Sequence, residues 1–387
     1  MDERERLCYC ALNMIFGYTP AVGLELCRHF GSASAVFDAD PEEIRILLGR
    51  DSPKAEMICG RALEDAEREL EKIREKGAGF ISIADDDYPR LLREIPDPPV
   101  GLYYKGVSPP WEIFNSRPAI AIVGTRRISR YGEEWCRRIT CALAEASVKP
   151  VIVSGLAYGT DIIAHRTAVE KGLPTIGVMA SGIDIVYPWR HIDFAGRMAS
   201  SEGCALVTDY PAGCMPVAYN FLRRNRIIAG LSSAVIVIES RLKGGSMHTA
   251  AFATDYNRDL YALPGRVDDE CSQGCLSLIR SQRAEAIFDV WDLVEKLGLG
   301  FDGRREKDDL RARAETYFRG RTPPEMTEML IRVLSMIIEY RGIGVDGLCR
   351  KTGLEYPDVW MCASRLEAEG FINIDLMQRC AVNIKNA

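Results

Sequence analysis

The sequence is poor in histidine and in clustered cysteine, which argues against a metal site. Only four histidines occur among 387 residues. There are thirteen cysteines, but the closest pairs, Cys8-Tyr-Cys10 and Cys271-Ser-Gln-Gly-Cys275, are not followed by a second pair at zinc-site spacing. We therefore expect no metal, and we interpret most of the cysteines as small buried apolar residues of a reduced protein.

Long apolar runs and a positively charged start are missing as well. No stretch approaches the roughly 20 apolar residues that a membrane-spanning helix needs. Asp2, Glu3 and Glu5 stand where a secretory signal peptide would carry positive charge. We therefore expect a cytoplasmic protein that makes no use of a membrane.

The chain also lacks an excess of positive charge, since its formal net charge is −6. Any site for a polyanion must therefore be local. One candidate is an acid-free segment at residues 119–132, in which an apolar strand ends at Gly124 and is followed by Arg126, Arg127 and Arg130. The unpaired N–H groups at the start of the next helix favour an anion. The three arginines would add fixed positive charge there.

A second acid-free segment, residues 219–232, combines cations with an aromatic ring. Arg223, Arg224 and Arg226 follow closely after Phe221. Arginines can contact phosphates while a ring stacks on a base, although core packing of Phe221 is an equally good interpretation. Together the two segments predict a protein that holds nucleic acid.

Apolar and charged patterns divide the chain into four parts. Residues 1–75 are predicted to form short helices separated by glycines, as in a SAM-like or helix–hairpin–helix module. In residues 76–298, short apolar runs alternate with helical segments over most of the length, which predicts an α/β fold with a parallel sheet covered on both faces. Residues 299–322 carry dense charge of both signs and are predicted to be a linker. Residues 323–387 suggest three helices and a terminal hairpin, the order of a winged helix.

The predicted turn after residue 154 allows two interpretations. Ser154 and Gly155 end an apolar run, and Asp161 and His165 lie one helical turn apart in the segment that follows. A structural capping network is the favoured interpretation, with ligand contact as the alternative. A serine hydrolase using Ser154 and His165 is disfavoured because the Gly-X-Ser-X-Gly elbow is missing.

Two further loops could contact an anion or a single strand. Tyr187, Trp189 and Arg190 follow another apolar run and could line a groove, or could form a packed aromatic loop. The turn Lys243-Gly-Gly-Ser-Met-His could cradle a phosphate through its N–H groups, or could be a plain glycine loop. Neither a Walker lysine pattern nor a complete Gly-X-Gly-X-X-Gly is present, so we expect no nucleotide cofactor.

Taken in order, these motifs resemble those of the DNA-processing protein A family, also called Smf. The matching segments are Val-Gly-Thr-Arg at 123–126, Val-Ser-Gly-Leu-Ala-Tyr-Gly-Thr-Asp at 153–161, Gly-Ile-Asp at 182–184 with Tyr187-Pro188, Arg-Asn-Arg-Ile-Ile-Ala-Gly-Leu-Ser at 224–232, Gly-Ser-Met-His-Thr-Ala at 245–250 and Ala-Leu-Pro-Gly at 262–265. The resemblance covers roughly residues 75–295.

The resemblance implies an extended Rossmann-like fold that binds single-stranded DNA without catalysis. It further implies a homodimer that loads the recombinase RecA onto incoming strands in natural transformation. The candidate DNA-binding residues are Gly124, Thr125, Arg126, Arg127, Ser154, Gly155, Arg190, Phe221, Arg224, Asn225, Arg226, Lys243, Gly245 and Ser246.

Two other functions remain open from the sequence. One is a nucleotide phosphoribohydrolase on the same scaffold, resembling the lysine-decarboxylase-like family. The turn at 243–251 lacks the catalytic glutamate of that family's signature. The other is a sequence-specific regulator that binds duplex DNA through the predicted winged helix.

Overall fold

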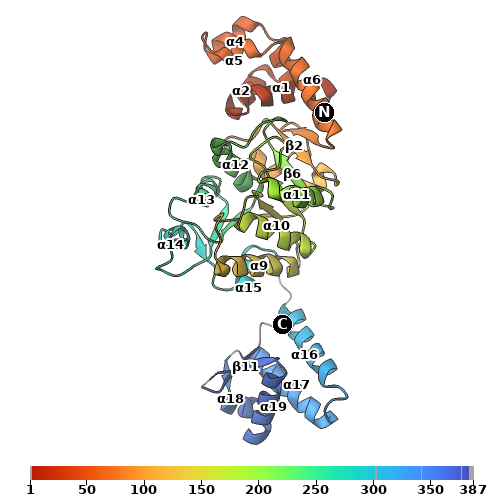
Figure 1. Ribbon diagram of the computed structural model, residues 1–387, viewed down its shortest axis with the longest axis vertical. Helices are drawn as coiled ribbons and strands as arrows, with labels where there is room; N and C mark the ends of the chain where they lie inside the picture. The colour runs from red at the N-terminus through yellow and green to blue at the C-terminus, as the bar shows by residue number, and fades with distance from the viewer. Residues whose placement is uncertain (1, 301–302, 341, 376, 383–387) are drawn as a thin grey trace. The chain divides into compact units, whose positions relative to one another are not determined.

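A computed structural model describes residues 2–300, 303–340, 342–375 and 377–382. The chain divides into two compact units, unit 1 (Met1–Phe301) and unit 2 (Asp302–Ala387) (Figure 1). Each unit has a hydrophobic core of its own. No helix in the described ranges is long and apolar enough to cross a membrane.

Unit 1 begins with a series of short helices, as the sequence predicted. Three of these helices are capped by the side chains of Asp2, Ser32 and Asp40, each of which accepts a hydrogen bond from a backbone N–H of the first turn. The first helix buries Leu12 and Phe16 in the same core cluster as the sheet. The helices therefore belong to unit 1, and their SAM-like assignment stays a prediction. They are α1 (Glu3–Phe16), α2 (Pro20–Phe30), α3 (Ala33–Asp38), α4 (Pro41–Leu48), α5 (Pro53–Met57) and α6 (Gly60–Glu75).

A nine-stranded mixed sheet forms the centre of unit 1. Its order is β1-β2-β6-β5-β4-β3-β7-β8-β9, with parallel pairing from β6 to β9 and antiparallel pairing of β1 with β2 and of β2 with β6. The antiparallel edge differs from the purely parallel sheet expected. The strands are β1 (Gly79–Ser82), β2 (Gly101–Lys105), β3 (Ala119–Val123), β4 (Val151–Ser154), β5 (Thr175–Val178), β6 (Ala205–Thr208), β7 (Ala234–Val237), β8 (Asp259–Ala262) and β9 (Glu285–Ala286).

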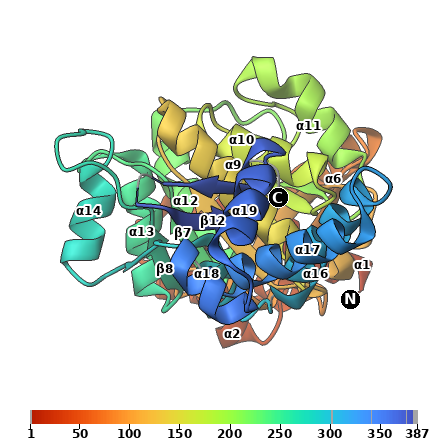
Figure 2. The same cartoon turned by 90° about the horizontal axis from the view of Figure 1, so that it is seen from below.

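Helices cover both faces of this sheet, which is why the central strands are apolar throughout. Ile120 and Ile122 of β3 pack into one core cluster, whereas Ala121 and Val123 pack into the other. The first face carries α9 (Arg130–Glu145), α10 (Thr160–Glu170), α11 (Ile192–Ala199) and α15 (Val290–Lys296). The second carries α7 (Arg90–Arg93), α8 (Pro110–Asn115), α12 (Ala218–Leu231), α13 (Gly245–Asp255) and α14 (Gln273–Arg280). Both views place α13 and α14 at one side of the unit and α11 toward the other (Figures 1 and 2).

The strand order reverses beside β3. The chain runs from β3 outward through β4 and β5 to β6, and then returns through α12 to β7, which pairs with the other side of β3. Such a switch point leaves a crevice at the carboxyl ends of the parallel strands, where ligands of open α/β sheets bind. The turn after β3 lies at this point.

In its described residues, unit 2 contains four helices and a small antiparallel sheet of order β10-β12-β11. The predicted charged linker is wrong for residues 303–318, which form α16 and bury Leu310, Ala314 and Phe318 against the following helix. The helix–hairpin order after it agrees with the sequence, and the winged-helix assignment stays a prediction. The elements are α16 (Gly303–Phe318), α17 (Pro324–Glu339), β10 (Ile343–Gly344), α18 (Val345–Thr352), α19 (Tyr356–Ala368), β11 (Ile372–Ile374) and β12 (Arg379–Val382).

Candidate nucleic-acid interface

One cation and two rings come together above the carboxyl ends of the strands. Arg126 lies in the turn after β3, Tyr187 in the loop after β5, and Phe221 in the first turn of α12. The guanidinium carbon of Arg126 is 4.8 Å from the centroid of the Phe221 ring. The Tyr187 ring meets Phe221 edge-on, with centroids 5.5 Å apart. We call these three residues the Arg126 cluster.

Further exposed cations belong to the loops at this edge. Arg127 follows Arg126, Arg190 lies in a short 3-10 helix (Trp189–His191) after the Tyr187 loop, and Lys243 lies in the turn after β7. The Arg190 guanidinium lies over the exposed Trp189 ring, 5.6 Å from its centroid. Within the part of the chain that the structure describes, none of these cations, nor Arg126, lies within ion-pairing distance of a carboxylate. Their charge is therefore available to a ligand.

The N-terminus of α9 is not the anion site that the sequence suggested. Glu239, fully buried at the end of β7, accepts hydrogen bonds from the backbone N–H of Ser129 (2.9 Å) and from its hydroxyl. The Ser129 hydroxyl oxygen in turn accepts from the N–H of Gly132. The protein's own carboxylate thus fills the position expected for a phosphate. A lone glutamate two residues after an apolar strand was the sequence signal for this role.

The turn between β4 and α10 is also held by a carboxylate of the protein itself. The Asp161 carboxylate accepts from the N–H groups of Gly155 (3.2 Å) and Ala157 (3.3 Å). Burial raises the pKa of Asp161, and the nearby Arg224 opposes that rise. The structural interpretation of this turn therefore agrees with the structure, but the expected helix cap does not, because Asp161 binds N–H groups of the turn and the N-terminus of α10 has no side-chain cap.

Ser154 and His165 are structural residues. The fully buried Ser154 hydroxyl donates to the carbonyl of Ile122 (2.6 Å), and His165 Nδ1 is 2.7 Å from the hydroxyl of Thr175. Burial lowers the pKa of His165 to about 3, with a smaller effect of Arg224 in the same direction. Because its hydroxyl is engaged inside the core, the structure gives no support to Ser154 as a nucleophile or as a side-chain contact for DNA.

Arg224 is buried, contrary to its predicted DNA contact. Only 3% of its surface is exposed, and its guanidinium donates to the carbonyls of Gly155 (2.6 Å) and Val178. Burial lowers its pKa to about 10; Asp161 opposes this effect and Arg126 adds to it. A Cβ at Gly155 would lie 2.5 Å from this guanidinium, so glycine is required for the close approach. Arg224 and Gly155 therefore join α12 to the strand ends.

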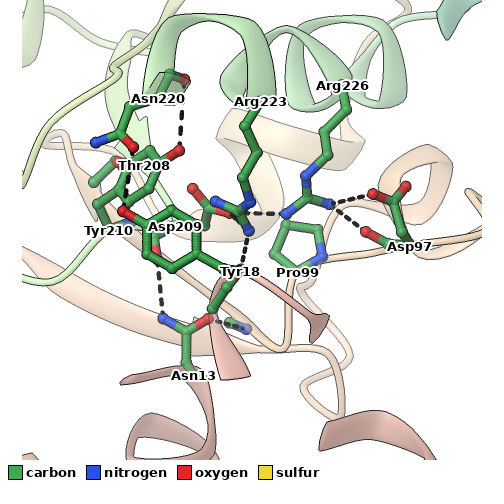
Figure 3. A network of polar contacts seen from close by, with 12 residues as sticks. Asn13, Tyr18, Asp97, Pro99, Thr208, Asp209, Tyr210, Asn220, Arg223 and Arg226 are labelled. Carbon is green, nitrogen blue, oxygen red and sulfur yellow. Dashed lines mark hydrogen bonds and ion pairs between the residues drawn. The ribbon is translucent and has the colours of Figure 1, made fainter. Parts of the chain in front are cut away.

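Arg226 is likewise internal, in a polar network around Asp209 (Figure 3). One oxygen of the buried Asp209 carboxylate pairs with Arg223 (2.7 Å) and with Arg226 (2.8 Å). Arg226 also pairs with Asp97, and Arg223 donates to the carbonyl of Gly17. The sequence analysis did not identify Asp209 as a partner of these arginines. The signal was a carboxylate next to the end of an apolar strand, as for Glu239.

The turn after β7 is held by internal hydrogen bonds. The amide nitrogen of Asn225 donates to the carbonyl of Gly245 (3.3 Å), and the buried Ser246 hydroxyl donates to that of Ser240 (2.8 Å). Asn225 and Ser246 therefore shape the turn, contrary to their predicted side-chain contacts, while Gly245 and Lys243 remain exposed.

The turn after β3 is braced against α10. The carbonyl of Thr125 accepts from the N–H (3.2 Å) and the hydroxyl (3.3 Å) of Thr160. Gly124 and Thr125 are half-buried, whereas Arg126 and Arg127 extend from this base into solvent.

Among the described residues, no group of three or more His, Cys, Asp or Glu side chains could hold a metal ion.

Comparison with known proteins identifies relatives that cover the central part of the chain or nearly all of it. The sequence profile of the DNA recombination-mediator protein A family matches residues 79–298. Protein Smf of Synechocystis is 33% identical over 393 aligned positions, covering 96% of this chain and 98% of that protein. DNA processing protein DprA of Streptococcus pneumoniae is 37% identical over 238 positions, covering 62% of this chain and 80% of that protein.

Two solved structures share the fold and significant identity. The X-ray structure of DNA processing protein A from Streptococcus pneumoniae superposes with a TM-score of 0.64 at 30% identity, covering 74% of this chain and 95% of that one. The same protein from Helicobacter pylori, described for its single-stranded DNA binding mode, superposes with a TM-score of 0.50 at 31% identity, covering 56% and 95%. The profile match, the full-length relative and these structures confirm the resemblance seen in the motifs: the chain belongs to the DNA recombination-mediator protein A family, which includes the DprA and Smf proteins.

Proposed function

We propose that this protein is a non-catalytic DNA-processing protein that binds single-stranded DNA at the carboxyl edge of its sheet. The observation that carries the proposal is the Arg126 cluster, a cation and two rings gathered from two loops and the first turn of α12. The related protein from Helicobacter pylori, which binds single-stranded DNA, supports it.

The chemistry of the site favours a single strand over a duplex. Aromatic side chains stack on bases that are unpaired and exposed, while arginines hold the phosphates without reading sequence. Four exposed cations are available to hold the phosphates: Arg126, Arg127, Arg190 and Lys243. We therefore expect weak sequence dependence and strong salt dependence.

Family membership supports two further proposals. The protein would load the recombinase RecA onto the bound strand during natural transformation and recombination, and it would act as a homodimer in the cytoplasm. Sedimentation of the purified protein tests the dimer. RecA filament formation on a strand already covered by single-strand-binding protein, with and without this chain, tests loading.

Fluorescence anisotropy of a labelled oligothymidylate, compared with a duplex of matching length across a salt series, tests the main proposal. If the four exposed cations each neutralise a phosphate, the slope of log affinity against log salt is about −3, since each contact contributes about −0.7 on a single strand. Equal binding of both forms, or no binding of the single strand at low salt, would contradict the proposal. Hydrolysis of nucleoside monophosphates, abolished by a change in this site, would favour the phosphoribohydrolase instead.

A further inference from the structure

A second pair of exposed rings lies at the start of α12, outside the Arg126 cluster. Tyr219 of α12 and Tyr18, from the turn between α1 and α2, have ring centroids 6.0 Å apart and planes inclined by 33°. Tyr219 is 60% exposed and Tyr18 is 53% exposed. Met215 and Val217, just before the helix, are exposed as well. Apolar surface is thus concentrated where α12 meets the N-terminal helices.

The Tyr18 ring is held in place by contacts with the polar network around Asp209. Its hydroxyl donates to the side-chain oxygen of Asn220 (3.2 Å), and the Arg223 guanidinium lies 5.1 Å from its centroid. Arg223 also donates a hydrogen bond to the carbonyl of Gly17, the residue just before Tyr18. Figure 3 shows Tyr18 beside Arg223 and Asp209. A ring fixed in this way loses little conformational entropy when a ligand stacks on it.

The two sets of rings lie close to one another. Tyr219 and Phe221 are two residues apart in the first turn of α12, which places them on different sides of a helix about 10–12 Å across. A strand passing around the start of this helix could therefore contact both within a few nucleotides.

The charge around the second pair suits a polyanion. The first turn of α12 contains no acidic residue. Lys54 of α5 (Pro53–Met57) donates a hydrogen bond to the hydroxyl of Thr19, the residue next to Tyr18. Exposed rings with a neighbouring cation are the elements from which single-strand binding surfaces are built.

We propose that Tyr18 and Tyr219 form a second base-stacking step, which continues the single-strand path from the Arg126 cluster onto the N-terminal helices. The occupant is a base of the same strand, a few nucleotides from the one at Phe221. This inference rests on the proposed function, because it presupposes that a strand is bound at Phe221.

The test compares oligothymidylates of two lengths. One, of ~2 nucleotides, is too short to pass from Phe221 around a helix about 10–12 Å across, and the other, of ~16 nucleotides, spans both sites. The double variant Tyr18→Leu with Tyr219→Ala is expected to bind the long strand between about fivefold and about a hundredfold more weakly, and the short strand unchanged. Trp111→Ala is the matched control, because it removes an exposed ring with an arginine over it from the helix that precedes β3. Tyr18→Phe keeps the ring and is expected to bind as the unmodified protein does.

Photo-crosslinking gives a readout that a purely structural role would not produce. A strand carrying 5-iododeoxyuridine is expected to crosslink to Tyr18 or Tyr219. Equal affinity of the double variant and the control at both lengths would overturn the inference. An equal loss at both lengths would do so too, because the rings would then act only by supporting α12. If the unmodified protein bound neither strand, the proposed function itself would fail, and this inference with it.

Discussion

The guanidinium of Arg126 covers a face of the Phe221 ring, with its central carbon 4.8 Å from the ring centroid. The contact joins a turn after β3 to a helix that begins almost a hundred residues later. An exposed contact of this kind contributes about 0.5–1 kcal/mol. A base that stacks on this face must displace the guanidinium, which then becomes free to pair with a phosphate. The two residues are therefore expected to contribute to DNA binding in separable ways.

Replacing Arg126 by glutamate should weaken single-strand binding and make its salt dependence less steep. Losing one phosphate contact changes the slope of log affinity against log salt by about 0.7. Arg90→Glu is a matched control, since Arg90 is exposed and lies over the Trp111 ring, outside the Arg126 cluster. Anisotropy titrations across a salt series measure both variants. Unchanged affinity and slope in Arg126→Glu would remove Arg126 from the site.

Replacing Phe221 by alanine should weaken binding without changing the salt slope, because the ring carries no charge. The expected loss is about fivefold to about a hundredfold, as for other rings that stack on bases. Phe221→Trp should keep most of the affinity, and its fluorescence should change when a base stacks on the indole. If the alanine variant altered the slope as much as Arg126→Glu does, the assumed division of roles would be wrong.

Replacing Arg226 by alanine should lower the stability of the protein. The change removes one partner of the buried Asp209 carboxylate, and breaking a buried ion pair costs about 3 kcal/mol. Urea unfolding measures the free energy of unfolding. Arg127→Ala, at an exposed position, should stay within about 0.5 kcal/mol of the unmodified protein. A stable Arg226→Ala variant with a flatter salt slope would show that Arg226 contacts DNA after all.

His165 should make the protein less stable in mild acid. Its pKa is lowered by burial to about 3 in the folded state and is about 6.5 when the chain is unfolded. Between these values the unfolded state binds more protons, so the free energy of unfolding falls as the pH decreases. From about pH 7 to about pH 5 the contribution of this residue is a loss of about 2 kcal/mol.

The comparison with His165→Gln isolates this effect, because glutamine does not titrate. The variant is expected to start from a lower stability and to lose about 2 kcal/mol less over the same pH interval. Urea unfolding at several pH values checks the difference between the two curves. Parallel curves would mean that His165 is not buried in its neutral form.

The sequence alone determined the family and the general architecture. The apolar runs at 120–123, 151–154 and 234–239 are local features, and the glycine turns after them mark the strand ends, so both can be recognised without the fold. The position of the site at the carboxyl edge follows from the same pattern, because parallel strands bring their ends together.

Only the tertiary structure decided which arginines face solvent. Arg126 and Arg224 both lie in arginine-rich segments without acidic residues, yet one is exposed and the other is 3% exposed beneath the strand ends. The carboxylates that fill the expected anion positions or pair with arginines come from other segments: Glu239 lies 110 residues from Ser129, and Asp209 lies 17 residues from Arg226. Burial and charge pairing depend on which segments pack together in space. Residue type and spacing along the chain therefore identified the surface, and packing selected the side chains that remain free to bind.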